Sequence, residues 1–255
     1  RDALDALGSG ARHWTFVSSI SVYADHSVLG QGVGAPVLPP LTEPPTEEQA
    51  SDPDVYGAVK VASEEAVRSA VGDRAFVVRA GLICGPGDVT DRFGYWAARF
   101  ARGGRAAVPD SPGHPGQIVD VRDLADWIVR AGEQGLTGTF DASGPRSTLD
   151  AVLDEVAEAV GAADLERVRV REDVLVAAGV NPWAGPRSLP LWLPEPLRGL
   201  PAHDTAPAIA AGLRIRPVAE TAIGALETER ALGLDRERRA GLTPDDEAEV
   251  LASVR

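Results

Sequence analysis

The sequence contains no methionine, one cysteine and one lysine among its 255 residues. The single cysteine, Cys84, excludes an internal disulfide and is typical of a reducing compartment. No apolar run approaches the roughly 18 residues that a membrane-spanning helix needs, and no segment reads as a secretion signal. These absences predict a cytoplasmic protein with no membrane partner.

Basic residues are few relative to acidic ones. The 25 Lys and Arg residues stand against 38 Asp and Glu, which gives a formal net charge of −13. This charge repels phosphate backbones and no basic run offsets it, so nucleic acid is not an expected partner. The four histidines have no Cys or His at ligand spacing, so we expect no metal site.

The absence of methionine also concerns the start of the chain. The sequence begins with Arg1, and an initiator methionine is usually removed only before small residues. We therefore expect the natural N-terminus to lie upstream.

Strand and helix patterns alternate along the chain. Strands are expected at 14–17, 75–83, 117–121, 138–142 and 168–170, and helices at 1–8, 53–71, 90–102, 123–133, 149–160, 204–211, 218–232 and 244–253. This alternation predicts a parallel α/β sheet. The long Gly- and Pro-rich segment 24–53 is expected to be a loop, either a lid or a substrate contact. The irregular segment 182–201 fits a packed surface loop or the wall of a substrate pocket equally well.

The helix over 53–71 carries the residues of most chemical interest. Ser51 or Asp52 can cap it, and Gly72 can end it. Its predicted apolar side consists of Val55, Val59, Ala62, Ala66, Val67 and Ala70. Tyr56 and Lys60, the only lysine, stand four residues apart and so share a face.

A phenol beside an ammonium is suited to proton transfer, because a nearby positive charge favours the phenolate. The strand before this helix ends in hydroxyls, at Ser18, Ser19 and Ser21. A serine hydroxyl from that strand end could hold a substrate oxygen beside the pair.

The run Val17-Ser18-Ser19-Ile20-Ser21-Val22-Tyr23, followed by Tyr56-x-x-x-Lys60, resembles the extended short-chain dehydrogenase/reductase family, in particular its NAD-dependent epimerase/dehydratase group. Segments 79–87, 120–125 and 212–217 resemble later parts of that family in the right order. The resemblance implies a Rossmann-like, doubly wound parallel sheet whose N-terminal strands are missing, with a small, mostly helical C-terminal substrate lobe. It implies a partial NAD(P)-binding domain over 1–145 and a substrate-binding lobe over 146–255, to which 88–116 contribute.

The resemblance also assigns roles to single residues. It makes Tyr56 the general acid/base on a substrate hydroxyl or carbonyl, Lys60 the residue that favours its ionised form and binds the nicotinamide ribose, and Ser19 the catalytic hydroxyl. Ala80 and Gly81 would contact the cofactor, NAD or NADP, together with Tyr56 and Lys60. Ser21, Arg92 and Tyr95 would contact a small-molecule substrate, such as a nucleotide-linked sugar.

The same residues serve epimerases, dehydratases and reductases, so the reaction type stays open. The family often forms homodimers through the helix that carries the Tyr and Lys, which makes a homodimer a candidate state here.

The sequence departs from the family in one large respect. It has no Gly-x-x-Gly-x-x-Gly turn, the motif that holds the cofactor pyrophosphate. Either the chain is a piece of a longer enzyme, or it is a non-catalytic binding or regulatory module that keeps the fold. Loss of the first strands would expose an apolar sheet edge beside 14–17, which favours the first alternative.

Overall fold

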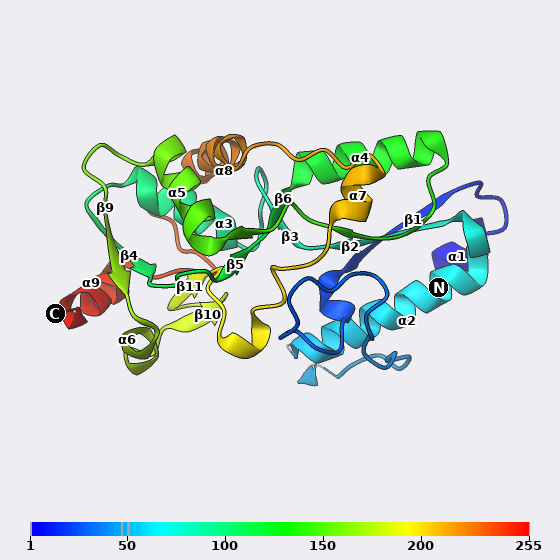
Figure 1. The fold of residues 1–255 in the computed structure, drawn as a ribbon, viewed down its shortest axis with the longest axis horizontal. Helices are drawn as coiled ribbons and strands as arrows, with labels where there is room; N and C mark the ends of the chain where they lie inside the picture. The colour runs from blue at the N-terminus through cyan, green and yellow to red at the C-terminus, as the bar shows by residue number, and fades with distance from the viewer. Residues whose placement is uncertain (1, 47, 50–51, 255) are drawn as a thin grey trace. The chain divides into compact units, whose positions relative to one another are not determined.

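Two compact units make up the chain in the computed structural model, which describes residues 2–46, 48–49 and 52–254. Unit 1 comprises the described residues up to Leu82, with Arg122–Arg146 and Pro196–Ile215. Unit 2 comprises Ile83–Val121, Ser147–Glu195 and the described residues from Arg216 onward. The chain passes back and forth between the units, as the colours in Figure 1 show. The functional division predicted at residue 145 stays a prediction.

Unit 1 is built on a parallel sheet of three strands in the order β1-β2-β7: β1 (Trp14–Ser19), β2 (Ala75–Ala80) and β7 (Gly138–Ala142). Helix α2 (Pro53–Val71) covers one face and α4 (Val121–Gln134) the other (Figure 1). Alternate residues of β2 serve the two faces, because side chains alternate along a strand.

The two faces of β2 have different partners. Val77 packs with Val67 on the α2 side. The ring of Phe76 lies 5.0 Å from that of Trp127 on α4. Helices on both faces of a parallel sheet make the doubly wound arrangement that the sequence predicted.

The ends of α2 follow the sequence prediction. The Asp52 side chain accepts a hydrogen bond from the Asp54 N–H, and Pro53 occupies the first turn. Gly72 ends the helix at φ 57°, a left-handed backbone that favours glycine. The alternative cap, Ser51, lies outside the described residues.

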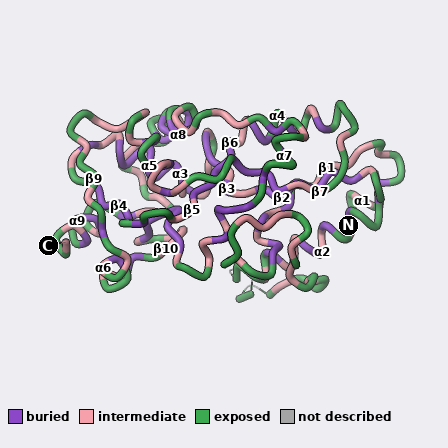
Figure 2. Tube along the Cα trace, viewed as in Figure 1, coloured by how far each residue is buried: buried purple, intermediate pink, exposed green. Residues whose placement is uncertain are grey.

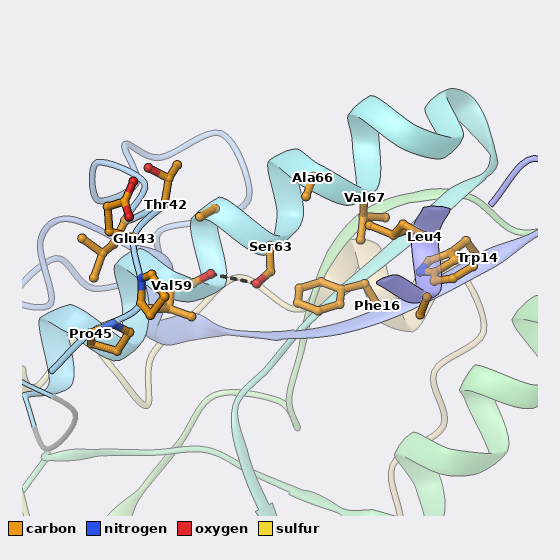
Figure 3. Close-up of a pocket in the computed structure, with 14 residues that line it drawn as sticks. Leu4, Trp14, Phe16, Thr42, Glu43, Pro45, Val59, Ser63, Ala66 and Val67 are labelled. Carbon is orange, nitrogen blue, oxygen red and sulfur yellow. Dashed lines mark hydrogen bonds between the residues drawn. The ribbon is translucent and has the colours of Figure 1, made fainter. Parts of the chain in front are cut away.

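Of the residues predicted for the apolar side of α2, Val67 is buried, but the other five are only partly buried or exposed. The buried residues are Gly57, Val61, Glu64, Val67 and Val71. Glu64 lies in the middle of this row and interrupts its apolar periodicity. The sequence pattern therefore indicated a neighbouring face of the helix as the apolar one. That neighbouring face is only partly covered. With Trp14 and Phe16 of β1, it lines a hollow of about 370 Å³ (Figure 3).

The remaining elements of unit 1 are short. They are α1 (Asp2–Leu7), η1 (Ile20–Val22), η3 (Gly72–Arg74) and α7 (Ala206–Ala210). No helix in the described part of the chain has both the length and the apolar character needed to cross a bilayer.

Unit 2 combines helices with pairs of short strands. Its helices are α3 (Arg92–Ala101), α5 (Leu149–Val160), α6 (Glu172–Ala177), α8 (Val218–Leu232) and α9 (Pro244–Ser253). Its strand pairs are β4 (Arg105–Pro109) with β9 (Glu166–Val170), β5 (Pro115–Gly116) with β8 (Ser147–Thr148), and β10 (Asn181–Trp183) with β11 (Ser188–Pro190). Strand β3 (Leu82–Cys84), whose first residue belongs to unit 1, pairs with β6 (Ile118–Asp120). The short 3₁₀ helix η4 (Glu195–Leu197) lies at the boundary of the units. Helices α3, α5 and α8 pack on one another, and the buried side of α3 holds Phe93, Trp96, Ala97 and Phe100 as predicted.

Several predicted boundaries need correction. The strand expected over 75–83 is divided at Gly81 into β2 and β3, although the Gly81 N–H still donates to Ala142 O of β7 at 3.0 Å. Helix α6 and strands β4, β5, β8, β10 and β11 were missed. These strands are two to five residues long, too short for an alternating pattern to stand out. Figure 2 shows that buried and exposed stretches alternate within both units.

Candidate active site

The carboxyl end of β1 holds the first predicted catalytic residue. Ser19 is the last residue of the strand and caps η1: its Oγ accepts from the Ser21 N–H at 3.1 Å and donates to Ser21 Oγ at 3.0 Å. These two bonds hold the Ser19 hydroxyl at the end of the sheet, where ligands bind in open parallel α/β folds.

Helix α2 brings the other two residues to the same strand end. The Lys60 Nζ donates to Val17 O at 3.0 Å and lies 5.6 Å from the centre of the Tyr56 ring. The predicted proximity of Tyr56 and Lys60 is therefore present. Tyr56 is 47% exposed, so its ring is open to a ligand.

The environment of Lys60 is mixed. Burial lowers the pKa of Lys60, because desolvation penalises the ammonium, and the carboxylate of Glu64 acts in the opposite direction. The Nζ also lies 5.3 Å from the centre of the Phe16 ring, within the range of a cation–π contact.

Gly57, beside Tyr56, permits a close approach of α2 to η1. A Cβ at this position would lie 2.1 Å from Ser21 O and 2.6 Å from a methyl carbon of Leu38. Only glycine fits that gap, so this residue lets α2 lie directly against the segment that carries Ser21.

The residues predicted for the cofactor lie on the next strand. Ala80 is the register partner of Ser19 across β1 and β2, and Gly81 follows it. A Cβ on Gly81 would lie 2.7 Å from Ser143 Oγ. Both residues are thus at the same sheet end as Ser19, which is consistent with their predicted role.

The residues predicted for the substrate divide between the units. Ser21 touches Ser19 in unit 1, as described above. Arg92 begins α3 in unit 2, and its guanidinium carbon lies 4.7 Å from the centre of the Trp183 ring. Tyr95 is only 2% exposed and packs edge-on to Trp96, so its ring offers little surface to a ligand.

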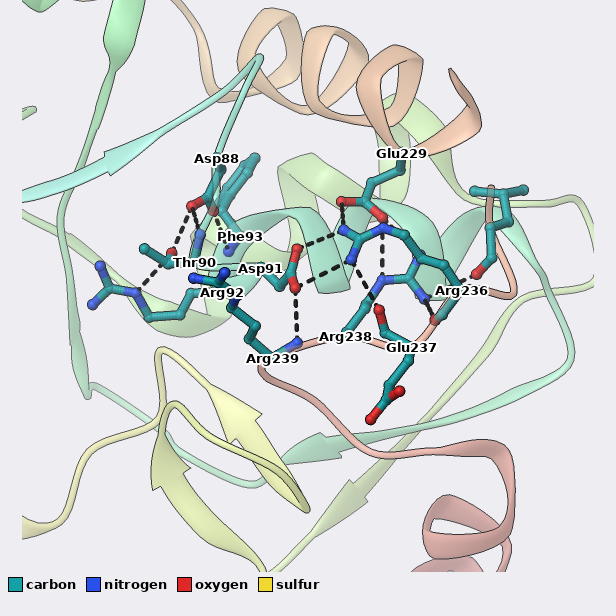
Figure 4. A network of polar contacts seen from close by, with 11 residues as sticks. Asp88, Thr90, Asp91, Arg92, Phe93, Glu229, Arg236, Glu237, Arg238 and Arg239 are labelled. Atoms are coloured by element: carbon teal, nitrogen blue, oxygen red, sulfur yellow. Dashed lines mark hydrogen bonds and ion pairs between the residues drawn. The ribbon is translucent and has the colours of Figure 1, made fainter. Parts of the chain in front are cut away.

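Arg92 is next to a polar network in unit 2 that the sequence did not predict (Figure 4). Asp91 accepts hydrogen bonds from Arg236 and from the Arg239 N–H, and Arg236 also bonds Glu229. Burial opposes ionisation of Asp91, but these bonds outweigh it and lower the pKa of Asp91.

A buried polar row in unit 1 was also not predicted from the sequence. Ser18 of β1, Arg79 of β2 and Asp141 of β7 are partners in register across the sheet. Glu64 of α2 bonds both Ser18 and Arg79. The available signal was that a charged residue interrupted an otherwise apolar strand at Arg79, and another lay one helical turn beyond Lys60. Within the described residues, no group of three or more His, Cys, Asp or Glu side chains is arranged to hold a metal ion.

Neither a protein-family model nor a curated protein matches the sequence. Solved structures do. RMD from Pseudomonas aeruginosa complexed with NADPH is 18% identical, with a TM-score of 0.55 over 90% of this chain and 71% of that one. WbmG from Bordetella bronchiseptica with NAD and UDP is 15% identical, with a TM-score of 0.59 over 94% and 66%. UDP-glucuronic acid 4-epimerase from Bacillus cereus with NAD is 12% identical, with a TM-score of 0.56 over 90% and 65%.

The chain has the Rossmann-like fold of NAD-binding epimerases. The fold class that the sequence predicted is thereby confirmed, and so is the resemblance to the epimerase/dehydratase group at the level of fold. The chain spans about two thirds of the length of these structures, from 65% to 71% in the three named.

Proposed function

We propose that this chain carries the catalytic residues of an NAD(P)-dependent enzyme of the epimerase, dehydratase or reductase type. Its substrate would be a hydroxyl or carbonyl compound, with a nucleotide-linked sugar as the first candidate. The observation that supports this most is the anchoring of Lys60 on Val17 O, which sets an ammonium beside Tyr56 and two residues from Ser19.

Each residue has a role in this proposal. Tyr56, with its exposed ring, would exchange a proton with the substrate oxygen, and Ser19 would hold that oxygen through its hydroxyl. Lys60 would favour the ionised phenol by its charge. Its bond to Val17 O uses one of three N–H donors, so donors remain for a ribose hydroxyl.

The residues present fit the nicotinamide end of the cofactor. Tyr56, Lys60 and the Ala80–Gly81 strand end lie at one edge of the sheet of unit 1. NAD or NADP, when bound, supplies the hydride chemistry, and the protein supplies position and charge. Of the three structures named above, two hold NAD and one NADPH, which supports this cofactor class. The sequence contains no Gly-x-x-Gly-x-x-Gly turn for the pyrophosphate.

The first test is dinucleotide binding. NADH and NADPH fluorescence would be titrated with the chain, while circular dichroism reports that it is folded. Binding of either supports the proposal. A folded chain that binds neither contradicts it and favours the alternative, a binding or regulatory module that keeps the fold.

The second test is Tyr56→Phe, which removes one oxygen. We expect dinucleotide binding to be nearly unchanged and turnover of the enzyme's substrate to fall by roughly 10²–10⁴-fold, the usual contribution of a general acid/base. Candidate substrates are nucleotide-linked sugars, followed by the nicotinamide absorbance for net redox and by product analysis for epimerisation or dehydration. Retained turnover would refute the role of Tyr56.

A further inference from the structure

A buried ion pair in unit 1 joins Glu64 of α2, one helical turn from Lys60, to Arg79 of β2. Glu64 is 1% exposed and Arg79 5%. Arg79 Nε donates to Glu64 Oε1 at 3.0 Å and Arg79 Nη2 to Glu64 Oε2 at 2.9 Å, a two-pronged contact. The Ser18 hydroxyl donates to Glu64 Oε1 at 2.6 Å, and Arg68 Nη2 donates to Glu64 Oε2 at 2.8 Å.

These contacts fix α2 against two strands at once. Ser18 and Arg79 are register partners in the ladder of β1 and β2, so a single carboxylate bridges both strands. Arg79 is held from its other side as well: its Nη1 donates to Tyr23 Oη at 3.1 Å, and the Tyr23 hydroxyl donates to Asp141 at 2.6 Å. Any rotation or slide of α2 would break bonds at Ser18 and Arg79 together.

Tyr56 and Lys60 lie on the same helix as Glu64, so fixing α2 also fixes their positions. Tyr56, Lys60 and Glu64 are spaced four residues apart, so they follow one another along nearly one face. Lys60 bonds the backbone of Val17 while Glu64 bonds the side chain of the next residue, Ser18. The carboxylate thus sets both the position of α2 and the charge one turn from the ammonium.

Stability alone does not account for this arrangement. A buried ion pair pays a large desolvation penalty, and apolar side chains of similar size often pack as well or better. They would hold the helix, but they would supply no negative charge beside Lys60. Burial lowers the pKa of Lys60, and the charge of the Glu64 carboxylate opposes that fall.

We propose that Glu64 is a positioning residue for the Tyr56–Lys60 pair, fixing α2 through Ser18 and Arg79 and placing a negative charge one helical turn from the Lys60 ammonium. This inference rests on the proposed function, since the pair it positions is the proposed proton-transfer pair. Glu64 itself touches neither substrate nor cofactor in this role.

The sequence offers a direct experiment, because Lys60 is the only lysine. A tag-free chain grown with ¹³C-labelled lysine gives a single Cε resonance, whose shift with pH measures the ionisation of Lys60 alone. The measurement is made on the wild type, on Glu64→Gln, and on Glu65→Gln as a matched control. Glu65 is the next residue on α2, has the same charge, and is exposed.

In Glu64→Gln we expect the midpoint of the Lys60 titration to fall by about half a pH unit or more, the effect of losing one charge at close range. Glu65→Gln should leave it unchanged. A folded Glu64→Gln chain whose Lys60 titrates as in the wild type overturns the proposal, because the charge of Glu64 would then have no effect on Lys60.

Glu64→Gln leaves Arg79 buried without its partner, so this variant could fold poorly. Ser18→Ala is therefore measured in parallel, since it removes one hydrogen bond to Glu64 and keeps the ion pair. We expect the Lys60 midpoint to stay near its wild-type value, because Glu64 keeps its charge, and a fall as large as that expected for Glu64→Gln counts against the proposal. These readouts need no cofactor. A chain that binds neither dinucleotide but shows the expected Lys60 midpoints refutes the proposed function alone. A chain that binds dinucleotide but does not show these midpoints refutes only the role of Glu64.

Discussion

Gly57→Ala offers the sharpest test of how α2 presents Tyr56. The added Cβ would lie 2.1 Å from Ser21 O and 3.0 Å from Ser21 C, both backbone atoms that cannot rotate away. Ordinary contact begins near 3.4 Å, so α2 and η1 would have to separate by roughly 1 Å. Overpacking of this kind costs about 1–3 kcal/mol, and the gain in helix propensity from Gly to Ala returns at most about 1 kcal/mol. We expect a net loss of up to about 2 kcal/mol in the free energy of unfolding.

The matched control is Gly132→Ala in α4. Gly132 is exposed, and the nearest atom to its added Cβ is His13 Nδ1 at 3.7 Å, an ordinary contact. The same substitution should therefore stabilise this helix, by up to about 1 kcal/mol. The opposite signs separate the contact at Ser21 from the general effect of alanine in a helix.

Urea unfolding followed by circular dichroism measures both variants, with the midpoint and slope fitted together. The Lys60 Cε resonance of the folded Gly57→Ala chain should also move, because Lys60 lies on the next turn of α2. A Gly57→Ala chain as stable as Gly132→Ala would refute the close approach of α2 to η1.

Two further predictions concern buried carboxylates of unit 2. The pKa of Asp91 is lowered in the folded state, so its contribution is present above the unfolded value near 3.9 and is lost as pH falls through the folded pKa. Between pH 7 and pH 3, the melting temperature of the wild type should fall more steeply than that of Arg236→Gln. Equal slopes of melting temperature against pH would contradict this. Arg99→Met leaves the buried Glu247 carboxylate without the partner that bonds it at 2.6 Å, and should cost about 3–5 kcal/mol in urea unfolding. Arg171→Met, which breaks an exposed pair, should change stability by less than about 1 kcal/mol, and similar losses in the two variants would refute the distinction.

Local signals made much of the fold predictable. Helices Leu149–Val160, Val218–Leu232 and Pro244–Ser253 have the predicted bounds, because their apolar periodicity and end residues are local features. The proximity of Tyr56 and Lys60 was predictable for the same reason, since four residues make about one helical turn. Their chemical roles remain proposals.

Contacts between distant segments were not predictable in this way. Glu64 and Arg79 lie on a helix and on the strand after it, and their pairing depends on how α2 docks on the sheet. Asp91 and Arg236 are 145 residues apart, and Arg99 and Glu247 are 148 apart. A single sequence contains charges that could pair in many ways, and only the packed structure selects among them.

Each unit contains a buried Arg–Glu ion pair, and comparing the two pairs limits what such a pair can indicate about function. In unit 2, Glu247 is buried and paired with Arg99 much as Glu64 is paired with Arg79 in unit 1. The described surroundings of Glu247 hold no exposed phenol and ammonium pair, and its carboxylate also accepts a hydrogen bond from the Ala107 N–H, a structural contact. Burial of an ion pair is therefore no evidence of function by itself. What sets Glu64 apart is its place one turn from Lys60 and beside Ser18, so the argument for its role depends on the response of Lys60 to its removal, and not on the strength of the pair.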